Sequence, residues 1–192
     1  EAYDYFQKLQ FKNLLSRFDI TKPADKAEEG FQEVSDFNMA KKIFSEAAGA
    51  DCVGACIFWN EKDVLPLFAS QARLGGIGLC FEKNHSYCIR TGNEISKEWL
   101  LEKLSETAGG AGRFVMFDLK AALPQLSLTE TKNCFDATVA AYLLYPLKNN
   151  YTYEDVAREQ LELMIDEKVE GQAKACYEAY TAYAASFVLW DK

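Results

Sequence analysis

The stretch CVGACIFWNEKD, residues 52–63, predicts a buried strand that ends in polar residues. Its first eight residues are apolar or small, and a continuous run of this kind is typical of a strand buried on both faces of a sheet. The chain then becomes polar, with Asn60, Glu61, Lys62 and Asp63. Carboxylates are preferred ligands of hard metal ions. The end of this strand is therefore the first candidate site.

Strand and helix patterns alternate on both sides of this stretch. Strands are predicted at 31–36, 52–59, 74–82, 87–90 and 113–117. Residues 83–86 are predicted to form a hairpin turn, and the glycines of 109–112 to end a helix. Helices are predicted at 38–49, 96–107, 118–126, 134–146, 152–163 and 171–190. This order favours a mixed α/β domain with a small central sheet flanked by helices.

Capping residues support several of these boundaries. Asn38 or Asp36 is the expected N-cap of the first of these helices, and Ser96 and Thr152 are the expected N-caps of two others. Pro146 is expected to stop the apolar helix that begins at 134.

Length and composition predict one compact domain. The chain has 192 residues, enough for a substantial core, and its 49% hydrophobic content excludes a disordered chain. Residues 3–18 repeat apolar side chains at helical spacing, and the polar residues 19–30 are interpreted as a linker. We therefore expect a linker helix and linker at 1–30 and the domain at 31–192, with both ends interpreted as cuts in a longer protein. No apolar run reaches the roughly 20 residues that span a bilayer.

Charge and cysteine content argue against two kinds of function, tight nucleic-acid binding and zinc binding. The formal net charge of −8 argues against tight autonomous binding of nucleic acid, because neutralising phosphates supplies much of that affinity. The spacing of the cysteines is a poor zinc pattern, since no second pair follows Cys52 and Cys56 and His85 is the only histidine. Reduced thiols in a cytoplasmic protein are expected. The six cysteines are Cys52, Cys56, Cys80, Cys88, Cys134 and Cys176.

Four segments together resemble one known family. They are YDYFQKLQFKNLLSRF (3–18), IGLCFE (77–82), CFDATVAAYLLYP (134–146) and YTYEDVAREQL (151–161). In this order they are similar to the patterns LF-x-x-LEF-x-SLL-x-R, VGLSFA, FDTMLAAYLLDP and YSLDDLAERYL of the 3′–5′ exonuclease domain of bacterial DNA polymerase I, a family A polymerase. The third segment is the most specific match, and the resemblance covers nearly the whole chain.

The resemblance implies a ribonuclease-H-like (DnaQ-like exonuclease) fold. It also implies that active relatives remove the last nucleotide of a primer with two divalent metal ions, which clamp the attacking and leaving oxygens. Two hard dications require several carboxylates that converge on one point. The family supplies them from three motifs.

The first family motif, Asp-x-Glu, lies at the end of the first core strand. In the preferred alignment Trp59 takes the Asp position and Glu61 keeps the Glu position. A shift by one residue puts Phe58 and Asn60 there instead. Neither alignment gives a pair of carboxylates, so the resemblance implies a degenerate first motif.

The second and third family motifs are also degenerate. The second, Asn-x-Lys-[Tyr/Phe]-Asp, corresponds to residues 118–122, where Lys120 remains and Ala122 replaces the metal-binding Asp. The third, Tyr-x-x-x-Asp, corresponds to residues 178–182, with Glu178 at the Tyr position and Ala182 at the Asp position. The comparison implies that no catalytic, cofactor or metal residue remains.

The sequence therefore favours an inactive, vestigial exonuclease-like domain that acts as a scaffold for the polymerase domain of its parent chain. The expected assembly is a monomer without a membrane segment, which meets DNA through the parent enzyme. No cofactor is expected in this domain, whereas Mg²⁺ is expected for the parent polymerase and for active relatives.

Two other functions stay open at this stage. One is an active metal-dependent 3′–5′ exonuclease with relocated carboxylates, whose set is Glu61, Asp63, Asp118 and Asp136. The other is a module that holds a single-stranded primer end without cutting it.

Several residues have a structural interpretation beside a functional one. Asp118 and Asp136 begin helices, where a carboxylate favours the helix dipole. His85 is expected at the surface of the hairpin turn, and GGIG (75–78) is expected to serve close strand packing. The tyrosines of the last helix are expected in the core or at a domain interface and not as base-stacking groups; they are Tyr177, Tyr180 and Tyr183.

Overall fold

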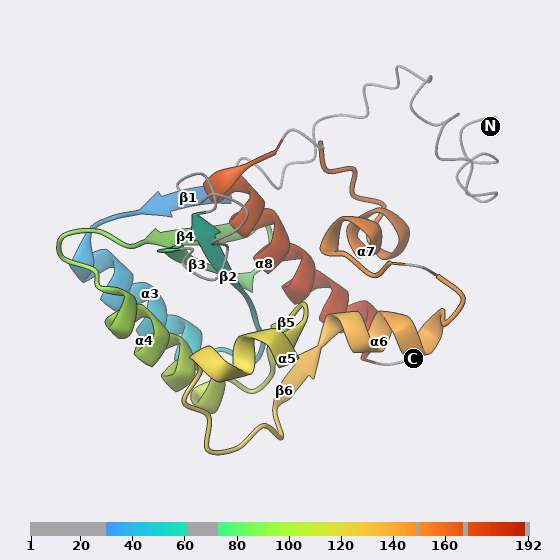
Figure 1. Cartoon of the computed structure of the whole chain (residues 1–192), viewed down its shortest axis with the longest axis horizontal. Coiled ribbons are helices and arrows are strands. Elements are labelled where there is room, and N and C mark those ends of the chain that lie inside the picture. Colours follow the sequence, from blue (N-terminus) through green and yellow to red (C-terminus); the bar gives the residue numbers. More distant parts are fainter. Residues whose placement is uncertain (1–29, 61–72, 149, 167–168, 191–192) are drawn as a thin grey trace.

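The computed structural model describes residues 30–60, 73–148, 150–166 and 169–190 (Figure 1). The predicted helix at 3–18, the linker, Glu61 and Asp63 lie outside the described residues. Over the described part, no helix is long and apolar enough to cross a membrane.

A six-stranded mixed sheet forms the centre of the molecule, with the strand order β1-β4-β3-β2-β5-β6. β2 pairs antiparallel with β3 and parallel with β5, while β3 pairs antiparallel with β4. β1 and β6 form the two edges and run parallel to β4 and β5. The strands are β1 (Phe31–Val34), β2 (Val53–Asn60), β3 (Arg73–Glu82), β4 (His85–Arg90), β5 (Phe114–Met116) and β6 (Cys134–Asp136).

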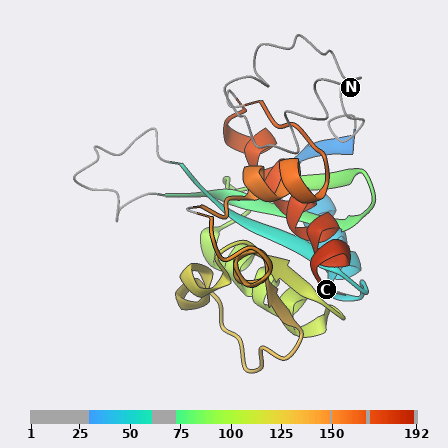
Figure 2. The same cartoon turned by 90° about the vertical axis from the view of Figure 1, so that its right-hand side faces the viewer.

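Helices cover both faces of the sheet (Figures 1 and 2). α3 (Phe37–Ala48) and α4 (Lys97–Gly110) lie side by side and share the core of one face. α8 (Gly171–Leu189) crosses the other face over β2 and β3, and α6 (Ala137–Leu144) and α7 (Tyr153–Gln160) pack against α8. The mixed α/β architecture is the one that the sequence predicts.

The alternation of side chains along the strands divides the core into two layers. Val53 and Ala55 of β2 point into the layer under α3 and α4, together with Ile77 and Leu79 of β3. Cys56 of β2 points into the layer under α8, as do Cys80 and Cys88. The prediction of a strand buried on both faces is confirmed for β2.

Glycines on β2 and β3 allow α8 to lie very close to the sheet. A Cβ atom at Gly54 would lie 2.2 Å from the backbone oxygen of Ala179, and one at Gly78 would lie 2.4 Å from that of Ala175. Real side chains do not reach such distances, so both positions require glycine. The interpretation of GGIG (75–78) as a packing segment is confirmed.

The helix predicted at 134–146 is wrong at its start, because residues 134–136 form β6. Asp136 is the N-cap of α6, and its Oδ1 accepts hydrogen bonds from the N–H groups of Thr138 and Val139. This cap begins the helix at Ala137. The apolar residues before it continue the same pattern, which concealed the short strand.

Four other predicted segments differ from the structure in their bounds. α4 continues through Gly109 to Gly110, and Asn133 then caps its end by donating to the backbone oxygens of Ala108 and Ala111. The hairpin turn contains only Lys83 and Asn84. α7 ends at Gln160, and residues 118–126 divide into α5 (Leu119–Ala122) and a 3₁₀ turn, η3 (Leu123–Gln125), which contains Pro124.

Candidate functional site

The candidate site lies where β2 ends, and the face of each side chain there is fixed by strand alternation. Cys56 and Phe58 pack in the layer under α8, whereas Ile57 and Trp59 pack on the opposite side with α3 and α4. A Cβ atom at Gly75 would meet both the Phe58 ring and Oδ1 of Asn60, so those two side chains share a face.

Trp59 therefore points away from α8, although the preferred alignment gave it the first carboxylate position. Its ring packs on the core of the α3/α4 layer, and the ammonium nitrogen of Lys97 lies 5.6 Å from the ring centroid. In the shifted alignment Phe58 and Asn60 face α8, and neither is a carboxylate. The two alignments could not be separated by sequence, because the strand is apolar on both sides.

Glu178 is the acidic residue of α8 that meets β2. It is half-buried, and burial raises the pKa of its carboxyl group. A hydrogen bond from the Cys56 thiol and the charge of Lys174 act in the opposite direction, while Glu154 raises the pKa further. The pKa of the Cys56 thiol is raised well above its ordinary value, mainly by burial and also by Glu178. Burial thus shifts the pKa of each group in the direction of its uncharged form.

The positions of the metal-binding Asp in the second and third motifs, Ala122 and Ala182, do not meet at the end of β2. Ala122 is buried in the core of the α3/α4 layer, where it follows the short helix α5. Ala182 is completely buried in the layer under α8. Ala122 and Ala182 are thus core residues of two different layers, and Trp59 is partly buried against the α3/α4 layer.

Asp118 and Asp136 lie at the ends of the neighbouring strands β5 and β6, and both cap helices. Oδ1 of Asp118 accepts from the N–H of Ala121 at 3.3 Å. Oδ1 of Asp136 accepts the two α6 N–H groups, and its Oδ2 accepts from Leu119 N–H at 2.9 Å. The interpretation of both residues as helix-start carboxylates is confirmed. Within the described ranges, no three His, Cys, Asp or Glu side chains are grouped so that they could hold a metal ion.

His85 is the first residue of β4. The prediction that it lies in the hairpin turn is therefore wrong. Its ring stacks on Tyr87 at a centroid distance of 4.6 Å, and its Nδ1 lies 3.7 Å from Oε1 of Glu82. Tyr87 also donates a hydrogen bond to that oxygen. His85, Tyr87 and Glu82 thus form a half-exposed cluster beside the hairpin turn.

The tyrosines of α8 have packing roles. Tyr177 is buried and meets Phe31 edge to face at 4.7 Å. Tyr180 and Tyr183 are half-buried against the layer under α8, and the Tyr180 hydroxyl lies 3.4 Å from Oδ1 of Asn84. The core interpretation of these residues is confirmed.

All six cysteines are free thiols, as predicted, and only Cys134 is more than slightly exposed. Burial raises the pKa of each thiol; for Cys80 and Cys88 the value is about 12. Thiols of this kind are poor nucleophiles. Cys56, Cys80, Cys88 and Cys176 act as small core residues between α8 and the sheet, whereas Cys134 is partly buried against the α3/α4 layer.

A polar cavity of about 390 Å³ lies away from this site, near the end of α4 and the loop before β6. Its lining includes Ser105, Ser127 and Thr129, together with Glu130 and Lys132, which pair with each other at 3.1 Å. Neither β2 nor α8 contributes to it.

No protein-family model matches the chain, and no curated protein sequence matches it significantly. Solved structures do match. An RNase D of Trypanosoma brucei in complex with RNA U12 superposes with a TM-score of 0.65 at 12% identity, covering 90% of this chain and 66% of that one. Brucella melitensis NrnC bound to pGG gives 0.54 at 14% identity, with 84% and 79% covered.

A third similar structure is Pol1 of M. smegmatis, described as its POL domain in complex with DNA primer-template and dNTP. It gives a TM-score of 0.57 at 15% identity and covers 84% of this chain but 27% of the Pol1 chain. Identities this low establish the fold alone. The chain therefore has the ribonuclease-H-like fold of the DnaQ-type exonucleases, as the sequence predicts.

Proposed function

We propose that this chain is a 3′–5′ exonuclease-type domain of a family A DNA polymerase that has lost its two-metal site and acts as a scaffold for the polymerase domain. The observation that carries the proposal is the chemistry at the end of β2. The side chains that face α8 there are Cys56, Phe58 and Asn60, a thiol, a phenyl ring and an amide. None of them is a carboxylate.

The described residues do not fit a pair of Mg²⁺ ions. Such a pair needs several ionised carboxylates at one point. Glu178 is the acid of α8 that meets β2, and burial raises the pKa of its carboxyl group. Asp118 and Asp136 already accept hydrogen bonds from helix N–H groups. We therefore derive no metal-dependent step for this domain.

A surface at the end of α8 supports the scaffold role. Phe187 and Trp190 are about half exposed, and the Arg113 guanidinium lies 4.0 Å from the centroid of the Trp190 ring. Trp190 also packs on Phe135 of β6. Tryptophan, arginine and other aromatic residues are enriched at protein interfaces. We assign this surface to the polymerase domain, and contact with DNA to the parent enzyme.

A nuclease assay tests the loss of activity. A 5′-labelled single-stranded oligonucleotide incubated with the domain and millimolar Mg²⁺ or Mn²⁺ should keep its length. Stepwise shortening from the 3′ end that Glu178→Gln abolishes would contradict the proposal. The exposed substitution Glu130→Gln is the matched control for the change of charge.

The adjacency of Asp118 and Asp136 favours one second function, an active nuclease with relocated carboxylates. The two residues end neighbouring parallel strands, and the N–H of Leu119 donates to Asp136. That function requires shortening of the oligonucleotide by the unaltered domain and its loss in Asp136→Asn.

A further inference from the structure

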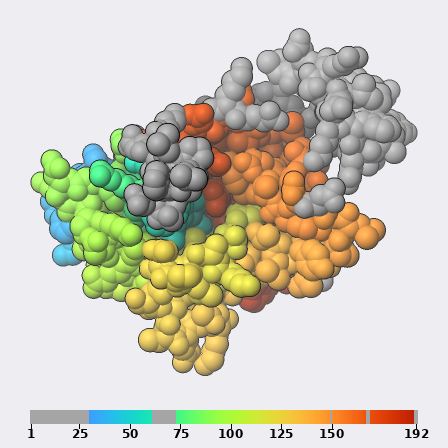
Figure 3. All heavy atoms as spheres, viewed as in Figure 1, coloured from blue at the N-terminus to red at the C-terminus, as the bar shows by residue number. Residues whose placement is uncertain are grey.

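Helix α6 and the loop after it present an uncharged surface, the α6 ridge, in the orange region of Figure 3. No charged residue occurs between Ala137 and Leu147. The outward face of a surface helix is normally polar, and a group of exposed apolar side chains marks a contact surface. The ridge consists of Val139, Tyr142, Leu143, Tyr145 and Leu147, with exposed fractions of 51%, 50%, 70%, 41% and 98%.

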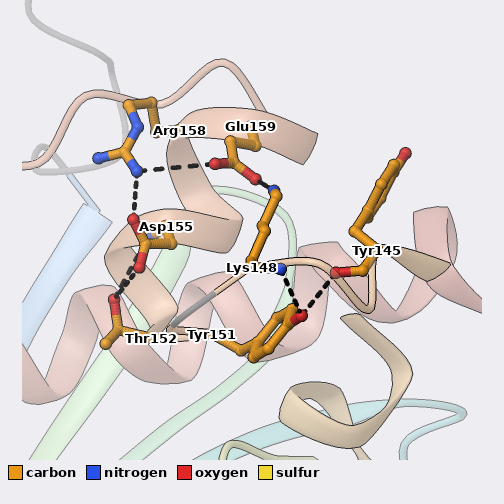
Figure 4. A network of polar contacts seen from close by, with 7 residues as sticks. All are labelled: Tyr145, Lys148, Tyr151, Thr152, Asp155, Arg158 and Glu159. Carbon is orange, nitrogen blue, oxygen red and sulfur yellow. Dashed lines mark hydrogen bonds and ion pairs between the residues drawn. The ribbon is translucent and has the colours of Figure 1, made fainter. Parts of the chain in front are cut away.

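A polar network holds the α6 ridge in a fixed shape (Figure 4). The Tyr151 hydroxyl donates to the backbone oxygen of Tyr145 and accepts from the N–H of Lys148, so the turn that carries Leu147 is held on both sides. The Lys148 ammonium pairs with Glu159 of α7. A surface that is already ordered loses little conformational entropy when it binds. The α6 ridge is therefore preorganised for contact.

The spacing of the ridge allows α6 to pack against a copy of itself. Val139, Tyr142 and Leu143 lie at positions i, i+3 and i+4, and Leu147 follows Leu143 by four residues. Rows of side chains at these spacings fit into the grooves between the same rows on a second helix. In a two-fold dimer both subunits contribute the same patch, so the patch must be complementary to itself. An uncharged helical ridge meets this requirement.

Charge favours this surface as the place where two copies meet. Each chain has a formal net charge of −8, so two copies repel one another. Contact through residues 137–147 places no like charges directly opposite each other, because this stretch carries none. Salt screens the repulsion between the remaining charges. Association through the α6 ridge should therefore persist or strengthen as the ionic strength rises.

The area of the α6 ridge matches what a weak dimer needs. Its five side chains are about 40% exposed or more, and they offer on the order of 500 Å² of apolar surface at roughly 100 Å² each. Two such faces together bury about 1,000 Å², which is the lower end of the range for specific interfaces. This area predicts a reversible dimer and not an obligate one.

We propose that the α6 ridge joins two copies of this chain in a two-fold dimer, in which α6 of one copy packs on α6 of the other. The dimer replaces the monomer expected from the sequence. It depends neither on the scaffold role nor on the loss of nuclease activity, because Phe187, Trp190 and the end of β2 lie outside the ridge. The failure of either proposal leaves the other standing.

Sedimentation equilibrium of the whole 192-residue chain tests the dimer. The chain should dimerise reversibly at concentrations up to roughly 200 µM, above the micromolar range of weak contacts. Leu143→Asp should raise the dissociation constant by roughly a hundredfold or more, because both copies lose a buried leucine and gain a like charge. Leu147→Asp should act in the same direction, whereas the conservative Leu143→Met should retain the dimer. Leu123→Asp is the matched control, because Leu123 is an exposed leucine of η3 outside the ridge.

A chain that sediments as a monomer at every concentration would overturn the proposal and would leave the α6 ridge to a different partner. A dimer of equal strength in Leu143→Asp and Leu147→Asp would overturn it as well, because the contact would then lie elsewhere. Dissociation as NaCl is raised from about 50 to 500 mM would reveal a contact held by ion pairs and would contradict an uncharged interface. A dimer that salt preserves, and that the two ridge substitutions dissociate while Leu123→Asp does not, supports the proposal.

Discussion

The backbone oxygen of Ala179 lies so close to Gly54 that a Cβ atom on the glycine would be 2.2 Å away. The backbone nitrogen of Tyr183 would be only 2.4 Å from the same atom. Both obstacles are backbone atoms of α8, so no side-chain rotation relieves them. The distance between α8 and the central strand is therefore set by a glycine.

Gly54→Ala should force α8 away from the sheet and lower the free energy of unfolding. We expect a loss of about 3 kcal/mol, at the upper end of the range for overpacked cores. Urea unfolding followed by circular dichroism measures it. Gly92→Ala is the matched control, because a Cβ atom at Gly92 meets nothing within 4 Å. Equal stability of the two variants would show that α8 does not lie against β2 as described.

Gly109→Ala should stabilise the domain. Gly109 lies inside α4, and a Cβ atom there meets nothing within 4 Å. Replacing glycine by alanine in the middle of a helix contributes about 0.5–1 kcal/mol, and we expect the lower end of this range because Gly109 lies in the last turn of α4. The midpoint of urea unfolding should rise accordingly. A lower midpoint would mean that α4 ends before Gly109, as the sequence alone predicts.

Glu178 should make the stability depend on pH. Its pKa is raised in the folded state, so the folded chain holds this proton more tightly than the unfolded chain does. Between the ordinary pKa of a glutamate and the raised value, the folded state binds more protons, and the free energy of unfolding falls as pH rises. Glu178→Gln should remove this part of the slope when unfolding is measured across the window. An unchanged slope, equal to that of Glu130→Gln, would contradict the burial of the carboxyl group.

Asp136→Ala should destabilise the junction between β6 and α6. The substitution removes an N-cap and leaves the N–H groups of Leu119, Thr138 and Val139 without this acceptor. Loss of an N-cap costs about 0.5–2 kcal/mol, and we expect the upper end here because a third donor is affected. Thermal unfolding measures the effect, and Glu130→Ala serves as the surface control. A change within the error of that control would exclude the capping role.

The sequence predicts the elements of this fold wherever one pattern dominates. The uncharged run at 52–59 predicts β2. The glycines of GGIG (75–78) predict that the next strand, β3, allows close packing. β6 was missed because Cys134 and Phe135 are apolar and continue the helical pattern of α6 without a break. The residue that marks the boundary between β6 and α6 is Asp136, because aspartate is a preferred N-cap and the helix begins directly after it at Ala137.

The site was harder to predict because it depends on which face each residue occupies. β2 is apolar on both sides, so its sequence does not show that Trp59 turns away from α8. The packing of α8 on Gly54 gives that information, because Gly54 faces α8 and strand alternation then places Trp59 on the opposite face. The contact between Glu178 and Cys56 could not be predicted from the sequence for a similar reason. α8 is rich in alanine and tyrosine on all sides, so only its packing on the sheet shows which residue meets Cys56.

Calorimetric titration with Mg²⁺ and Mn²⁺ tests the central claim most directly, because a two-metal nuclease site must bind its ions before any chemistry occurs. The unaltered domain should give no binding heat at millimolar ion, and Glu178→Gln and Asp136→Asn should give the same flat titration. Saturable binding of two ions that either substitution abolishes would contradict the account and would show that the domain retains a working metal site.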